Sequence, residues 1–112
     1  MKTEIYRGRG WGKDLIGECE DGIVYSGRGW DRTQIGSYSN GEIYRGYGWD
    51  KTFVGSFRNG DIYYGHGWSE ELVGSYSDGC IYRGRGMGKE QVGECNGPEH
   101  GAASAALLLL LS

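Results

Sequence analysis

The sequence predicts an all-β fold of five tandem 19-residue β-hairpin repeats, followed by a short C-terminal helix. Two observations support this prediction. One pattern recurs five times without insertion or deletion, and Asn-Gly or Asp-Gly dipeptides separate strand-like stretches. The period is easiest to follow through the tyrosines, which stand at Tyr6, Tyr25, Tyr44, Tyr63 and Tyr82.

The composition fits one small folded domain. Of 112 residues, 23 are Gly and one is Pro, aromatic residues make up 13%, and the formal net charge is -3. This composition excludes collagen, coiled coils and helix bundles, and it is too apolar for a disordered tail. The slight acidic excess provides no overall positive field for a nucleic-acid backbone, so nucleic acid is not the expected partner.

Each repeat contains a strand ending in Ile-Tyr or Val-Tyr, a Gly-x-Gly loop and a second strand. The dipeptide Asn40-Gly41 favours a two-residue type I′ turn, which would place Tyr38 opposite Ile43 on one face of the sheet. Strand alternation then puts Ile35 and Tyr44 on the other face. Because both faces carry large apolar side chains, we expect the sheet to be covered or to curl on itself.

Two architectures fit five hairpins, a closed ring or barrel and a short linear solenoid. The first and last repeats share Glu18-Cys19 and Glu94-Cys95, where the middle repeats have Ser followed by an aromatic residue. In a closed ring the first and last repeats would be neighbours, so the residues that they share favour closure. Duplication of a repeat would produce the same similarity. Closure would bring Cys19 and Cys95 near each other, so the sequence leaves open a disulfide between them beside the simpler expectation of free thiols.

The repeats occupy residues 1–98, and the tail 99–112 leaves the pattern. Its Ala and Leu residues favour a helix, which we expect to cover a sheet face or an open end, or to pair with a second copy. The residues of such a homo-oligomer contact would be Leu107, Leu108, Leu109, Leu110 and Leu111. This apolar run is shorter than the roughly 20 residues that span a bilayer, and no signal-peptide pattern is seen, so a cytoplasmic location is expected.

The sequence contains no pattern for catalysis, a metal or a cofactor that rises above background. The acids recur mostly in turns or beside Trp, and the three Cys lack the paired spacing of metal sites. The Gly-x-Gly loops lack the helix-opening context of phosphate loops. We therefore expect a protein that is not an enzyme and needs no cofactor.

The five loops between paired strands are the candidate binding sites. Four loops display a Trp beside polar or cationic residues, and aromatic faces stack on sugar rings or bases. Weak sites repeated at a fixed spacing gain avidity. The candidate residues are Trp11, Trp30, Trp49, Trp68, Arg9, Arg28, Tyr47, His66 and Arg85. The sequence leaves open whether the four Trp instead fill the core.

The stretch from Gly55 to Gly60, with its Phe-Arg-Asn-Gly, followed by Gly65-His66-Gly67, resembles the MORN repeat. The shorter unit and the Trp after the last Gly depart from that family. The Gly-Trp hairpins are also similar to the repeats of bacterial cell-wall-binding modules, which hold choline or wall polymer between aromatic rings. Both resemblances imply a non-catalytic repeat module that binds or scaffolds.

Three functional hypotheses follow. The first is a binding module whose aromatic loops take a glycan or cell-wall polymer. The second is a protein-interaction or oligomeric scaffold, in which the Trp belong to the core. The third is binding of single-stranded nucleic acid, against which the net negative charge counts.

Overall fold

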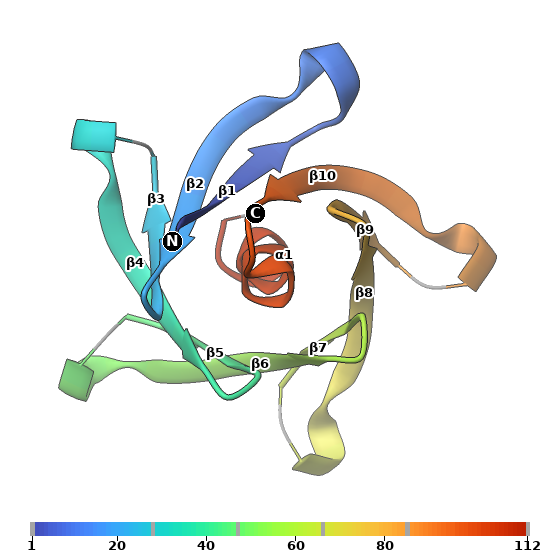
Figure 1. Ribbon diagram of the computed structural model, residues 1–112. Coiled ribbons are helices and arrows are strands. Elements are labelled where there is room, and N and C mark those ends of the chain that lie inside the picture. The colour runs from blue at the N-terminus through green and yellow to red at the C-terminus, as the bar shows by residue number, and fades with distance from the viewer. Residues whose placement is uncertain (1, 28, 47, 66, 85, 112) are drawn as a thin grey trace.

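The computed structural model describes residues 2–27, 29–46, 48–65, 67–84 and 86–111. It shows a flat ring of five arms around a central helix (Figure 1), with extents of 39 × 38 × 21 Å. Within the described residues, ten antiparallel strands form a closed barrel, in which β1 pairs with both β2 and β10. Closure of the ring is therefore confirmed, and the linear solenoid is wrong.

Each arm is a hairpin made of a shorter strand and a seven-residue strand. The strands are β1 (Lys2–Arg7), β2 (Asp14–Glu20), β3 (Ile23–Ser26), β4 (Thr33–Ser39), β5 (Glu42–Arg45), β6 (Thr52–Arg58), β7 (Asp61–Tyr64), β8 (Glu71–Ser77), β9 (Cys80–Arg83) and β10 (Glu90–Asn96). The arm tips hold the 3-10 turns η1 (Gly10–Gly12), η2 (Gly29–Asp31), η3 (Gly48–Asp50), η4 (Gly67–Ser69) and η5 (Gly86–Gly88). The arms are numbered one to five in this order, and helix α1 covers His100–Leu109.

Two-residue turns join each arm to the next, as the sequence predicts. Asn40 and Gly41 have φ angles of 51° and 78°, which is the left-handed backbone that a type I′ turn requires. Tyr38 lies opposite Ile43 across this turn, so the expected register is confirmed. Asp21, Asn59 and Asp78 begin the corresponding turns with positive φ.

The expected face of Ile35 is wrong because each long strand contains a β-bulge. Val24 pairs with Gly36 and Tyr25 pairs with Gln34, so Ile35 of β4 has no partner in β3. A bulge bends the strand and changes the direction of the side chains that follow. Ile35 therefore packs against the core, whereas Tyr44 does not belong to it. The equivalent residues Ile16, Val54, Val73 and Val92 also pack against the core.

Helix α1 fills the centre of the ring (Figure 1). Its alanines are fully buried, and so is one Ile or Val from the short strand of every arm. Those strand residues are Ile5, Val24, Ile43, Ile62 and Ile81. The small helix residues let the bulky strand residues close in around the axis, which makes a dense core from a short chain.

Five successive leucines meet five different arms. A Cβ placed on Gly17 would lie 3.1 Å from Cδ1 of Leu111 and 2.6 Å from the carbonyl oxygen of Tyr25. The same contact pairs Gly36 with Leu110, Gly55 with Leu109, Gly74 with Leu108, and Gly93 with Leu107. Because a helix turns by about 100° per residue, Leu107, Leu108 and Leu109 at the end of α1 point in different directions and reach different arms. Leu110 and Leu111, just after the helix, reach the other two arms.

This placement corrects the expected homo-oligomer contact. Leu107, Leu108 and Leu110 are buried inside their own barrel, with at most 8% of each side chain exposed, and Leu109 and Leu111 are half-buried. The tail thus covers the inside of its own ring, which was the other role expected for it. In the described parts of the chain, no helix is both long and apolar enough to cross a membrane.

The first and last arms resemble each other because the chain turns inward between them. After Gly97, the backbone N–H of Glu99 donates a 2.9 Å hydrogen bond to Oγ1 of Thr3, just before α1. Thr3 lies opposite Cys19 in the sheet. We attribute the small Cys at this position, where the middle arms have Tyr or Phe, to the space that the entering chain needs.

The disulfide considered for this seam does not form. Cys19 and Cys95 are free, buried thiols. Burial raises the pKa of both thiols, that of Cys95 to about 11, which keeps them protonated and unreactive at neutral pH.

We predict that Gly17→Ala lowers the free energy of unfolding by about 2 kcal/mol, because its new methyl group would collide with Leu111 and with a carbonyl oxygen. Gly12→Ala is the matched control in the same arm, since a Cβ there has no neighbour within 4 Å and the backbone is not left-handed. Urea denaturation measures both variants. Equal stability of the two would contradict the proposed packing.

Candidate binding site on the arms

The four tryptophans stand at the tips of the arms and are fully exposed. Their relative exposures are 106% for Trp11, 103% for Trp30, 103% for Trp49 and 105% for Trp68. The alternative that these residues fill the core is therefore wrong. Side chains exposed to this degree add little to the packed core, so packing does not explain their repetition at four tips.

The loop glycines shape the tips. Gly8 has a φ of 90°, and its N–H donates a 2.9 Å hydrogen bond to the carbonyl oxygen of Val92 on the neighbouring arm. The corresponding bonds in the other arms come from Gly27, Gly46, Gly65 and Gly84. The base of every arm is thus fixed to its neighbour, while the 3-10 turn beyond it projects into solvent.

The predicted site residues that the structure describes do not form one cluster. Arg9 is exposed beside η1, and the tips with their Trp are distributed around the rim of the ring (Figure 1). Arg28, Tyr47, His66 and Arg85 were also predicted as site residues and lie outside the described residues. The fifth tip carries Met87, which is as exposed as the tryptophans.

Sequence reasoning missed a groove between neighbouring arms. Between arms one and two, a groove of about 760 Å³ is lined by Lys2, Glu18, Glu20, Gly29, Trp30 and Arg32. Its counterpart two repeats later, of about 550 Å³, is lined by Asn40, Gly41, Glu42, Phe53, Ser56, Phe57, Arg58, Gly67 and Glu70. The 19-residue period relates the two grooves, because several of their lining residues are 38 positions apart, as Gly29 and Gly67 are. The sequence therefore contained a signal for equivalent sites.

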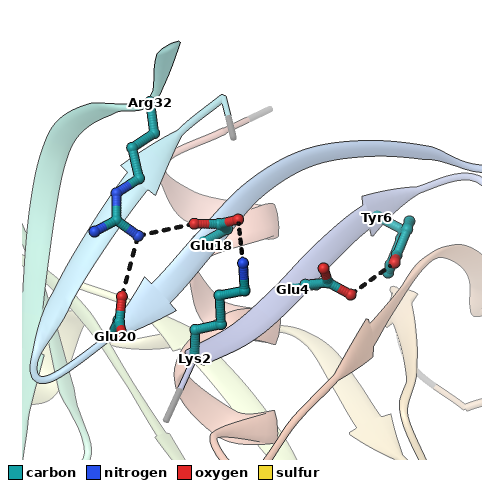
Figure 2. A network of polar contacts seen from close by, with 6 residues as sticks. All are labelled: Lys2, Glu4, Tyr6, Glu18, Glu20 and Arg32. Atoms are coloured by element: carbon teal, nitrogen blue, oxygen red, sulfur yellow. Dashed lines mark hydrogen bonds and ion pairs between the residues drawn. The ribbon is translucent and has the colours of Figure 1, made fainter. Parts of the chain in front are cut away.

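A buried carboxylate organises the first groove (Figure 2). Arg32 Nη1 donates to Oε1 of Glu18 at 2.9 Å and to Oε1 of Glu20 at 3.1 Å, and Lys2 Nζ donates to Oε2 of Glu18 at 3.3 Å. Burial opposes the charge of Glu18, but the hydrogen bonds from Arg32 and Lys2 outweigh it and lower the pKa of Glu18. Hydrogen bonds to Glu18 and Glu20 raise the pKa of Arg32.

A cation covers the repeated tyrosine of every arm. In four arms the cation comes from one position of the repeat: Lys13 lies over Tyr6, Arg32 over Tyr25, Lys51 over Tyr44 and Lys89 over Tyr82. The fourth arm has Glu70 at this position, and Arg58 from β6 covers Tyr63 at 4.0 Å instead. Arg58 also pairs with Glu70 at 2.6 Å, which inverts the Glu20–Arg32 pair of the other groove.

Chemically, each groove combines hydrogen-bond donors and acceptors with the edge of an arm that carries an exposed aromatic ring. Trp30 itself lines the first groove, next to two carboxylates and two cations. Among the described residues, no three His, Cys, Asp or Glu side chains are grouped so as to hold a metal ion. The arrangement suits reversible binding of a polar ligand with an apolar face.

Comparisons with protein-family models, curated proteins and solved structures found no match to this chain. The resemblances to MORN repeats and to cell-wall-binding hairpins therefore stay predictions.

We predict that Glu18→Gln lowers stability at neutral pH by about 2 kcal/mol, because the charged hydrogen bonds of a buried carboxylate are lost. The folded-state pKa of Glu18 lies below its ordinary value, so its contribution is present at neutral pH and is lost as the pH falls through that lowered pKa. The variant should therefore lose less stability than the wild type on acidification. Urea denaturation from pH 7 to pH 3 measures this difference, with a substitution of the exposed Glu71, Glu71→Gln, as the control. If the free energy of unfolding had the same pH dependence in the wild type and in Glu18→Gln, the prediction would be contradicted.

The inverted pair allows a second prediction. Glu70→Lys places a second cation beside Arg58 and should lower the melting temperature modestly. The double variant Arg58→Ser with Glu70→Lys recreates the combination of Ser39 and Lys51 in the preceding repeat. Its melting temperature should therefore be higher than that of Glu70→Lys alone. Thermal unfolding of the wild type, both single variants and the double variant gives the coupling. If the double variant were no more stable than Glu70→Lys alone, the equivalence of the two positions would be refuted.

Proposed function

We propose that the protein is a non-catalytic, multivalent binding module that takes a glycan or cell-wall polymer on its arms. The observation that carries this proposal is the full exposure of Trp11, Trp30, Trp49 and Trp68 at the arm tips. Aromatic rings in this position give a ligand a flat apolar surface without any change in the core.

The groove beside Trp30 supports a sugar as the ligand. A sugar ring has an apolar face that stacks on an indole, and hydroxyl groups that need both donors and acceptors. Arg32 and Lys2 supply donors, and the part-exposed Glu20 supplies acceptors. The groove volume of about 760 Å³ lies within the usual range for small-ligand sites, which is about 300–1,000 Å³.

The ring supports a polymer in preference to a single sugar. The arms project in different directions from one rigid barrel (Figure 1). A polymer with repeating residues can contact more than one arm, and each added contact increases the effective concentration of the next. Modest affinity at each arm is then sufficient.

A protein partner is the second candidate, because Met87 occupies the fifth tip and is fully exposed. Met and Trp are frequent in protein interfaces, whereas Met offers no aromatic face to a sugar. Single-stranded nucleic acid is the weakest candidate, since the net charge is -3.

We predict that Trp30→Ala abolishes glycan binding at its groove and leaves the melting temperature nearly unchanged, because the lost side chain is fully exposed. The measurement is a titration of intrinsic Trp fluorescence with a panel of soluble oligosaccharides and wall fragments. Trp49→Ala should weaken polymer binding in the same way, and Met87→Ala is the control that removes a tip without an aromatic ring.

The outcome separates the candidates. Loss of affinity in both Trp variants, with Met87→Ala unchanged, supports the glycan proposal. The glycan proposal fails if no oligosaccharide gives a saturable signal, or if the Trp variants bind as tightly as the wild type. A steep loss of oligonucleotide binding with added salt would instead favour nucleic acid.

A further inference from the structure

A separate groove lies where the fifth arm meets the first, near the C-terminal end of α1. It has a volume of about 310 Å³ and is lined by Arg7, Gly8, Arg83, Val92 and Leu107. None of these residues lines the groove beside Trp30. Strand β1 supplies Arg7, β9 supplies Arg83, and β10 and α1 supply the apolar residues.

The two arginines bring positive charge to this groove. Nη2 of Arg7 donates a 2.5 Å hydrogen bond to the carbonyl oxygen of Leu111, which positions the guanidinium. Among the described residues, no other hydrogen bond or ion pair engages the side chain of Arg7. In the part of the chain that the structure describes, no hydrogen bond or ion pair engages the side chain of Arg83. Asp14 lies opposite Arg7 and Glu90 opposite Arg83 in the strand register, but neither forms an ion pair with its neighbour.

The floor between the arginines is apolar. Val92 belongs to the residues that pack against the core, and Leu107 is the leucine that contacts Gly93 of the same arm. A ligand for this site therefore needs an anionic group for the guanidinium groups and an apolar part for the floor. Guanidinium groups bind planar carboxylate and phosphate oxygens through paired hydrogen bonds.

We propose that this groove binds a small anionic amphiphile, in which a carboxylate or phosphate group is joined to a short alkyl chain. The head group lies between Arg7 and Arg83, and the alkyl chain lies on Val92 and Leu107. The volume of about 310 Å³ limits the ligand to a head group and a few carbons.

The ring contains its own comparison site. The corresponding groove between the third and fourth arms, of about 460 Å³, is lined by Arg45, Thr52, Phe53, Val54, Tyr64, Gly65 and Leu109. Tyr64 replaces Arg7 there, so only one guanidinium group lines this groove. Nη2 of Arg45 donates to the carbonyl oxygen of Leu109 at 3.1 Å. The groove between the fifth and first arms should therefore bind anions more tightly than this one.

The test uses three probes with the same alkyl chain: sodium hexanoate, hexyl phosphate and 1-hexanol. Each is titrated into the full chain, and the backbone amide signals of Gly8 and Gly65 are followed by NMR. We expect at least one anionic probe to shift Gly8 with saturation, little shift of Gly65, and a much weaker response to 1-hexanol. Added sodium chloride should weaken binding, because the arginines are exposed.

Variants give the decisive comparison. Arg83→Gln should weaken binding of the anionic probe about fivefold or more, whereas Arg45→Gln should leave it unchanged. Neither substitution removes a buried side chain, so both variants should fold, and their amide spectra check this. The anion that binds more tightly identifies the head group. The proposal is overturned if 1-hexanol shifts Gly8 as strongly as the anions, if Gly65 responds equally, or if Arg83→Gln binds like the wild type.

Discussion

The contact between five successive leucines and five glycines is the constraint on which the rest of the structure depends. A ring of short strands leaves a central space, and Leu107 to Leu111 fill it only because the facing wall residue in every arm lacks a Cβ. In the part of α1 that precedes the leucines the sizes are exchanged, since small alanines share the core with Ile and Val of the strands. The C-terminal tail therefore supplies the central part of the core, and the strands supply the layer around it.

This core leaves the outer parts of the arms free to vary. A cation lies over each repeated tyrosine on the outside of the arms, and different residues supply that cation without any change in the barrel. Arg58 and Glu70 show this freedom, because they invert the charges of Glu20 and Arg32 at the same positions of the repeat. Binding groups at the tips and grooves can thus differ between arms while the fold stays the same.

Much of the fold followed from the sequence, because the repeat and the turn dipeptides act locally. Asn40-Gly41 determined a turn and its register, and the likeness of the first and last repeats indicated closure. The bulge at Ile35 was missed, since simple alternation contains no signal for an unpaired residue. The exposure of the tryptophans stayed open because an aromatic residue at one phase of a repeat fits a core or a surface equally well. The grooves were missed because they need two arms in their three-dimensional arrangement.

The most direct test of this account is the pattern of nuclear Overhauser effects between leucine methyl groups and glycine Hα protons. The account predicts one partner for each leucine, from Leu107 with Gly93 to Leu111 with Gly17, all within one molecule. A mixed sample of labelled and unlabelled chains distinguishes contacts within a molecule from contacts between molecules. Absence of these contacts, or their appearance only between molecules, would contradict the central role of the helix.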